Sequence, residues 1–185
     1  MRRITHVAAG FLFASVVTQP AGATVSDAAA NGFSVVEKLH LSATPDKVYS
    51  ELVIPSHWWN FEHTFSRNAA NLSLDARAGG CWCETLPEGG SVQHLAVVFA
   101  DPGRRLVMRG ALGPLQGLGV EGAMTIILKP SADGTDLSLT YSVGGYLKDG
   151  LESWAAPVDR VLSAQMTRLK SFIETGTPEP RAEPH

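Results

Sequence analysis

The chain has 185 residues, of which 44% are hydrophobic and 18% are charged, and its formal net charge is −3 with histidine neutral. This length and composition are typical of one ordinary globular domain. The sequence shows no basic patch, so nothing in it favours binding to nucleic acid.

Residues 1–23 have the pattern of an export signal. Two arginines open this stretch, residues 4–17 are mostly apolar, and Ala21-Gly22-Ala23 supplies a small-x-small cleavage pattern. The apolar run is short for a bilayer span. We therefore expect cleavage, a mature chain that begins near Thr24, and a periplasmic or secreted protein without stable membrane insertion. The alternative is an uncleaved or lipid-retained anchor.

The only two cysteines are Cys81 and Cys83. An exported protein reaches an oxidising compartment, where disulfides persist. Two residues apart in a regular strand, however, their Cα atoms would lie roughly 6.5 Å apart, near the upper limit for a disulfide. Free thiols, a bound metal, or a local departure from strand geometry are the three options.

The first part of the folded region reads as a strand followed by two short helices. Residues 24–32 are rich in Ala and Ser and are expected to be a flexible lead-in. Residues 33–41 alternate as a strand does. Thr44 and Pro45 then have the residue types of a helix N-cap and first turn, and a second short helical piece is expected to hold Trp58 and Trp59.

Hairpins follow, and then one long helix. Strands are predicted at residues 71–75, 81–86, 91–100, 105–112, 122–130 and 135–144, with hairpin-type turns between them. Residues 151–175 carry apolar side chains at spacings of three and four, which predicts an amphipathic helix, with a bend or a later start at Pro157. Gly176 is a good stop, and residues 177–185 are expected to be disordered.

This order predicts an α+β fold over residues 33–176. A curved antiparallel sheet of about seven strands would wrap around the long C-terminal helix, because that helix is the one element able to cover the apolar face of the sheet. The sequence carries no signal for the oligomeric state.

The order of elements and several short motifs resemble the Bet v 1-like or START-like (SRPBCC) helix-grip superfamily, and most closely its polyketide-cyclase and Hsp90-ATPase-activator-like branch. The motifs are Leu41-Ser-Ala-Thr-Pro-Asp-Lys-Val-Tyr-Ser-Glu-Leu52, His57-Trp58-Trp59, and Ala78-Gly79-Gly80 leading into Cys81-Trp-Cys-Glu84. The resemblance implies an apolar cavity between sheet and helix. Members bind lipids, steroids or polyketides, and some are enzymes or chaperone assistants. Because Hsp90 is cytosolic, the export signal argues against the chaperone role.

Turn lengths predict which residues face this cavity. Four-residue loops would pair Glu84 with Gln93, Cys83 with His94, and Phe99 with Leu106. The apolar face would then contain the expected ligand-binding residues, together with the tryptophans of the short helices and one face of the long helix. The predicted ligand-binding set is Trp58, Trp59, Trp82, Glu84, Gln93, Phe99, Met108, Met124, Tyr141, Trp154 and Val158.

Glu84 is the unusual member of that set, because a carboxylate on an apolar face is costly unless it is paired or protonated. It would be a polar anchor for a ligand or a general acid with a raised pKa. The alternative is a carboxylate near the sheet rim, either hydrated or bonded to an arginine. His63 is the other candidate for acid/base catalysis, although no paired acid supports it.

Cys81, Cys83 and His94 would project together from the opposite face of the sheet. Three such side chains are able to hold a soft metal. The alternative is a pair of small packed thiols beside a solvated histidine. A register slip of one residue would instead turn this trio into the cavity.

A glycine-rich apolar stretch spans residues 110–122. It contains Gly117-x-Gly119-x-x-Gly122, but no strand–helix–strand unit surrounds it, so we reject a dinucleotide site. A mobile lid over the cavity and a plain hairpin loop remain the two interpretations. Tyr146, just before the long helix, is a further candidate to reach the cavity.

The sequence thus predicts an exported binding protein for a small hydrophobic ligand, lipid-like or polyketide-like, that needs no cofactor. The alternatives are a cyclase-like or hydrolase-like enzyme that uses Glu84 or His63, and a metal or thiol site at Cys81, Cys83 and His94.

Overall fold

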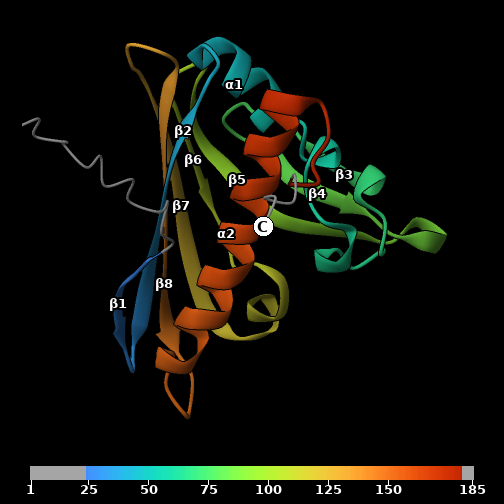
Figure 1. The fold of residues 1–185 in the computed structure, drawn as a ribbon. Coiled ribbons are helices and arrows are strands. Elements are labelled where there is room, and N and C mark those ends of the chain that lie inside the picture. Colours follow the sequence, from blue (N-terminus) through green and yellow to red (C-terminus); the bar gives the residue numbers. More distant parts are fainter. Residues whose placement is uncertain (1–23, 181–185) are drawn as a thin grey trace, which may run out of the picture.

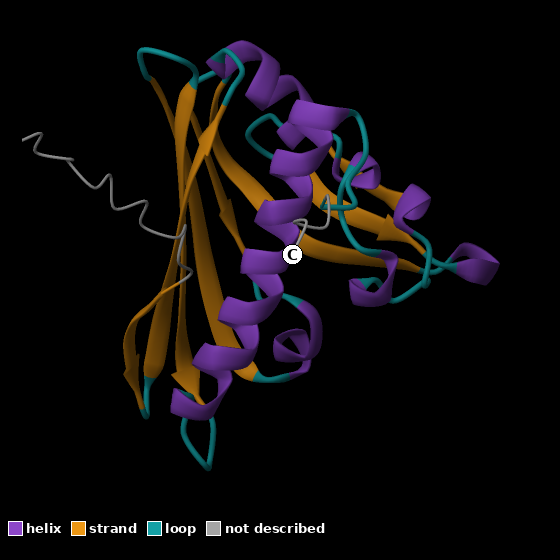
Figure 2. Ribbon diagram, in the orientation of Figure 1, coloured by secondary structure: helices purple, strands orange, loops and turns teal. Residues whose placement is uncertain are grey.

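The computed structural model describes residues 24–180. The predicted export signal at residues 1–23 and the last five residues of the chain lie outside this range. The described chain is an α+β fold in which a curved antiparallel sheet wraps around one long helix (Figures 1 and 2). No helix in this described part is long and apolar enough to span a bilayer.

The sheet has eight strands in the order β1-β2-β8-β7-β6-β5-β4-β3. Their bounds are β1 Thr24–Ala29, β2 Gly32–Leu41, β3 Leu72–Leu74, β4 Cys81–Thr85, β5 Ser91–Asp101, β6 Arg105–Arg109, β7 Gly119–Pro130 and β8 Thr135–Tyr146. The predicted number was about seven. The additional strand is β1, which lies in the stretch that we expected to be a flexible lead-in and pairs with β2 as the sheet edge.

Strands β7 and β8 have the register that the turn between them predicts. Met124 pairs with Tyr141, Ile126 with Leu139, and Leu128 with Leu137. All six side chains are buried. They form part of the apolar face, as the alternation of these strands requires.

Helix α1 (Pro45–Leu52) begins as predicted, with Thr44 accepting a hydrogen bond from the backbone N–H of Lys47 at 3.4 Å. Val48 and Leu52 are buried beneath it. Three short 3₁₀ turns follow: η1 (Pro55–His57), η2 (Phe61–His63) and η3 (Ala69–Asn71).

Helix α2 (Glu152–Thr175) lies along the concave side of the sheet, across β2 (Figure 1). Leu162, Met166 and Leu169 are buried at the predicted spacing. Pro157 lies inside the helix, so a later start is ruled out, and Gly176 ends the helix in a left-handed conformation with φ 79°.

The first residues after α2 pack back onto the helix, whereas we predicted disorder from residue 177 onward. The Ser171 hydroxyl donates to the backbone carbonyl of Glu179 at 2.9 Å. The Arg168 guanidinium pairs with the Glu179 carboxylate at 2.8 Å. Residues 177–180 therefore have defined contacts with the helix, while residues 181–185 lie outside the described range.

Strand β5 contains two irregularities that the turn lengths did not reveal. Trp82 pairs with Leu95 but Cys83 pairs with Gln93, so His94 is an extra residue in β5. A bulge of this kind redirects side chains and bends the strand. As a result His94 is buried on the concave side, and the predicted pairing of Cys83 with His94 is wrong.

The second irregularity lies four residues further along β5. Val97 pairs with Met108 as predicted, but Phe99 pairs with Val107 rather than Leu106, which makes Val98 the extra residue. Phe99 is therefore 46% exposed, with the Arg105 guanidinium 5.3 Å from the centre of its ring. Its predicted place on the cavity face is wrong.

Candidate functional site

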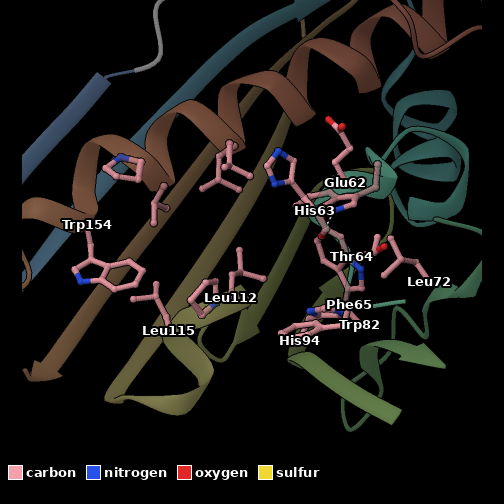
Figure 3. Close-up of a pocket in the computed structure, with 17 residues that line it drawn as sticks. Glu62, His63, Thr64, Phe65, Leu72, Trp82, His94, Leu112, Leu115 and Trp154 are labelled. Carbon is pink, nitrogen blue, oxygen red and sulfur yellow. Dashed lines mark hydrogen bonds between the residues drawn. The ribbon is translucent and has the colours of Figure 1, made fainter. Parts of the chain in front are cut away.

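A cavity of about 410 Å³ lies between helix α2, the strands β4 and β5, and two loop segments (Figure 3). One segment runs from Trp59 to Phe65 and the other from Leu112 to Leu115. The residues that line the cavity are Trp59, Glu62, His63, Thr64, Phe65, Leu72, Trp82, His94, Leu112, Gly113, Pro114, Leu115, Trp154, Pro157, Val158, Val161 and Leu162.

Tryptophan rings make up much of the apolar wall. The Trp59 and Trp82 rings meet nearly at right angles with centres 4.8 Å apart, and Trp58 packs behind them, 6.1 Å from Trp82. The indole N–H of Trp59 donates to the backbone carbonyl of His63 at 3.0 Å. Edge-to-face packing and this hydrogen bond hold the rings in place, so the wall is largely preformed.

A buried carboxylate–imidazole pair stands at one end of the cavity. His94 lies in the wall, and its Nε2 is 3.0 Å from Oε2 of Glu84. Glu84, 1% exposed, also accepts hydrogen bonds from the backbone N–H groups of Phe65 and Ser66. One carboxylate therefore holds both the imidazole and the segment that forms the cavity mouth.

Burial and hydrogen bonding act in opposite directions on this pair. Burial raises the pKa of Glu84, but the hydrogen bonds from Ser66, Phe65 and His94 outweigh it and leave the pKa lowered. Burial lowers the pKa of His94 despite the carboxylate beside it. At neutral pH, Glu84 is ionised and His94 is neutral. The prediction that Glu84 is a general acid with a raised pKa is wrong.

The mouth of the cavity is formed by the segment around η2. Glu62 and His63 are exposed, and Phe65 is 53% exposed with its ring 5.9 Å from that of His94. Among residues 24–180, the His63 side chain has no hydrogen-bond or ion-pair partner, and its pairing with an acid is not observed. The backbone N–H of Asn60 donates to Gln165 Oε1 of α2 at 2.8 Å, which ties this segment to the helix.

The glycine-rich loop forms the opposite wall and is anchored to the sheet. Its 3₁₀ turn η5 (Gly113–Gly117) places Leu115 in the core. The buried hydroxyl of Tyr141 accepts from the N–H of Leu112 at 3.0 Å and donates to the carbonyl of Gly110 at 3.1 Å. Burial raises the pKa of Tyr141 to about 12, so the hydroxyl keeps the proton that it donates. The loop is thus a tethered wall of the cavity.

The variant Tyr141→Phe is expected to reduce the free energy of unfolding by about 1–3 kcal/mol, because two partly buried backbone groups lose their partner. Hydrogen exchange at residues 112–118 should accelerate. Chemical denaturation and exchange mass spectrometry measure the two effects. Tyr146→Phe is the matched control, because Tyr146 is 77% exposed. Unchanged exchange in the loop would show that the hydroxyl is not its anchor.

The structure brings together only part of the predicted site. Trp59, Trp82, Trp154 and Val158 line the cavity, as does His63. The other predicted residues fall into three groups. The first group is buried in the core without lining the cavity: Trp58, Met108, Met124 and Tyr141. The second group lies outside both the core and the cavity: Gln93, Phe99 and Tyr146. The third is Glu84, which lies behind His94.

The predicted metal site is not formed. Cys81 and Cys83 are joined by a disulfide, with Cα atoms 5.5 Å apart rather than the 6.5 Å of a regular strand. Local contraction of β4 beside the bulge allows this bond. His94 lies on the other face of the sheet, so the three side chains do not converge. Among the described residues, no group of three or more His, Cys, Asp or Glu side chains is placed to hold a metal ion.

Sequence reasoning missed the cavity role of Phe65. It placed His94 in the cavity only if the register slipped by one residue, and it considered the 110–122 stretch as a lid or a plain hairpin loop. Alternation places His94 outward unless the bulge is known, and nothing in the sequence marks the bulge. The apolar residues among the glycines of the 110–122 stretch were the available signal for a wall built from that loop.

Comparisons with known proteins place the fold. No protein-family model matches the chain, and no curated protein matches it. Solved structures do match. A conserved protein of unknown function from Enterococcus faecalis aligns with a TM-score of 0.57 and 17% identity, over 86% of this chain and 82% of that one.

Two further solved structures match the chain with similar TM-scores and similarly low identity. CalU16 from Micromonospora echinospora aligns with a TM-score of 0.56 and 19% identity, covering 88% of each chain. A protein from Rhodobacter sphaeroides aligns with a TM-score of 0.54 and 21% identity, over 82% of this chain and 97% of that one. At these identities the similarity shows a shared fold.

Proposed function

We propose that this protein is an exported, non-catalytic member of the helix-grip superfamily that binds a small hydrophobic ligand, lipid-like or polyketide-like, between α2 and the sheet. The observation that carries the proposal is the cavity itself. Its volume of about 410 Å³ lies in the range of small-molecule sites, and its wall is mainly aromatic and aliphatic. Apolar burial of roughly 25 cal/mol per Å² would supply the binding energy.

A periplasmic or extracellular location is part of this proposal. The composition of residues 1–23 supports it. The disulfide between Cys81 and Cys83 supports it too, because such bonds persist in oxidising compartments. Expression with residues 1–23 attached to a reporter, followed by cell fractionation, tests the location. A reporter that stays in the cytoplasm would contradict it.

Filling the cavity tests the binding role. Val158 lies on α2 in the cavity wall and is half-buried, so Val158→Trp is expected to weaken binding of an apolar fluorophore such as 1-anilinonaphthalene about tenfold or more. The melting temperature should stay the same or rise, because a void is filled. Fluorescence titration and thermal unfolding measure the two effects.

The matched control is Ala156→Trp, on the exposed side of the same helix. It adds the same indole outside the cavity and should leave fluorophore binding unchanged. Equal binding by both variants and the parent would place the fluorophore elsewhere, and it would remove the physical basis of the proposed function.

A further inference from the structure

A buried imidazole with an unused ring nitrogen lies in the cavity wall. Nε2 of His94 must donate to Glu84, because an ionised carboxylate only accepts hydrogen bonds. The ring is neutral, so its single proton stays on Nε2 and Nδ1 carries a lone pair. Among residues 24–180, Nδ1 has no hydrogen-bond partner. The side chain is 8% exposed, so bulk water reaches it poorly.

Two other polar side chains of the inner wall already have hydrogen-bond partners. The Thr64 hydroxyl donates to one backbone carbonyl and accepts from one backbone N–H. The indole N–H of Trp59 donates to a carbonyl. The indole nitrogen of Trp82 is enclosed by protein and does not reach the cavity space. His94 is therefore the buried side-chain acceptor that the described wall offers to a ligand, because the indole nitrogens of the wall only donate; it lies close to Phe65 and Trp82 in Figure 3.

We infer that the cavity selects a ligand bearing a hydroxyl group, an alcohol or a phenol, whose O–H donates to Nδ1 of His94. This inference rests on the proposed function and names the chemical class of its ligand. An ether or a carboxylate of the same shape offers no proton and leaves the buried lone pair unsatisfied, which costs binding energy. Glu84 is the positioning residue, because it sets which ring nitrogen carries the proton.

A matched pair of probes tests the inference by calorimetry or fluorescence titration. The protein is expected to bind 2-naphthol about tenfold more tightly than 2-methoxynaphthalene, which has the same ring but no hydroxyl proton. In His94→Phe, which keeps an aromatic ring in the wall, the two probes should bind with equal affinity. Equal affinity for both probes in the unaltered protein would overturn the inference while leaving the binding role intact.

A measurement on the unaltered protein covers the case in which His94→Phe does not fold. Nitrogen NMR of the imidazole should show a protonated Nε2 and an unprotonated Nδ1, and only 2-naphthol should shift the Nδ1 signal. An Nδ1 signal that neither probe or both probes move equally would refute the hydroxyl contact. If neither naphthalene binds at all, the proposed function fails, and this inference fails with it.

Discussion

Glu84→Gln is expected to lower the free energy of unfolding by about 3 kcal/mol at neutral pH, because a buried, fully hydrogen-bonded carboxylate is lost. An amide has one accepting oxygen where the carboxylate has two, and Glu84 serves Phe65, Ser66 and His94. At least one buried donor is left unsatisfied. Urea denaturation followed by circular dichroism measures the change.

The same variant should loosen the cavity mouth. Amide exchange at Phe65 and Ser66 should rise, since both N–H groups end on Glu84. Asp101→Asn is the comparison, because Asp101 pairs with Arg104 in an exposed ion pair and its loss should change stability little. A Glu84→Gln protein as stable as the parent, with protected amides at both positions, would show that the Glu84 carboxylate does not hold the segment at the cavity mouth.

The contribution of the Glu84 carboxylate to the free energy of unfolding depends on pH, because the pKa of Glu84 is lowered in the folded protein. A carboxyl whose pKa is depressed in the folded protein stabilises it above the ordinary value of 4.5 and loses that contribution as the pH falls through the folded value. The difference in stability between the parent and Glu84→Gln should therefore be full at neutral pH and shrink in acid.

Glu37→Gln is expected to have the opposite effect on stability, and this effect grows as the pH rises from 4.5 to about 7. Glu37 is buried on β2, with one carboxyl oxygen that has no hydrogen-bond partner among residues 24–180. Burial, and then the charge of Asp159 on α2, raise its pKa to about 7. Asp159 also has a buried oxygen without a partner in that range. The charge of Asp159 on the helix thus acts on the carboxyl of Glu37 on the sheet.

The raised pKa makes the parent protein lose stability as the pH rises. The contribution of protonated Glu37 is complete below pH 4.5 and is lost as the pH rises through about 7. This difference in pKa corresponds to about 3 kcal/mol. A glutamine cannot ionise, so Glu37→Gln should be more stable than the parent by up to about 3 kcal/mol at pH 8 and by only about 1 kcal/mol at pH 5.

Thermal unfolding of both proteins across this pH range checks the effect. Glu88→Gln, an exposed change in the β4–β5 turn, should show no such difference between pH 5 and pH 8. A Glu37→Gln curve that runs parallel to that of the parent would show that Glu37 is already ionised, or hydrated, in the folded protein.

Local chemistry was enough to predict most of the elements. Thr44 and Pro45 are residue types that favour the start of a helix, and Gly176 is a residue type that favours its end; the structure has both ends there. In β7 and β8 a strict alternation of apolar residues, joined by a short turn, has one register that buries them all. The same reasoning placed Trp82 and Trp154 on the cavity side, because each is a large apolar residue on a face that must be covered.

The sequence by itself thus determined the fold class, the order of the main strands and helices from β2 onward, and the apolar face that α2 covers. Only the tertiary structure decided that His94 faces the cavity with Glu84 behind it, that Phe99 faces solvent, and that Cys81 and Cys83 approach closely enough to bond. The physical reason is the two bulges in β5, at His94 and at Val98. Each extra residue changes which side of the sheet the neighbouring side chains occupy, and a bulge forms because of contacts with neighbouring strands rather than a pattern within its own strand.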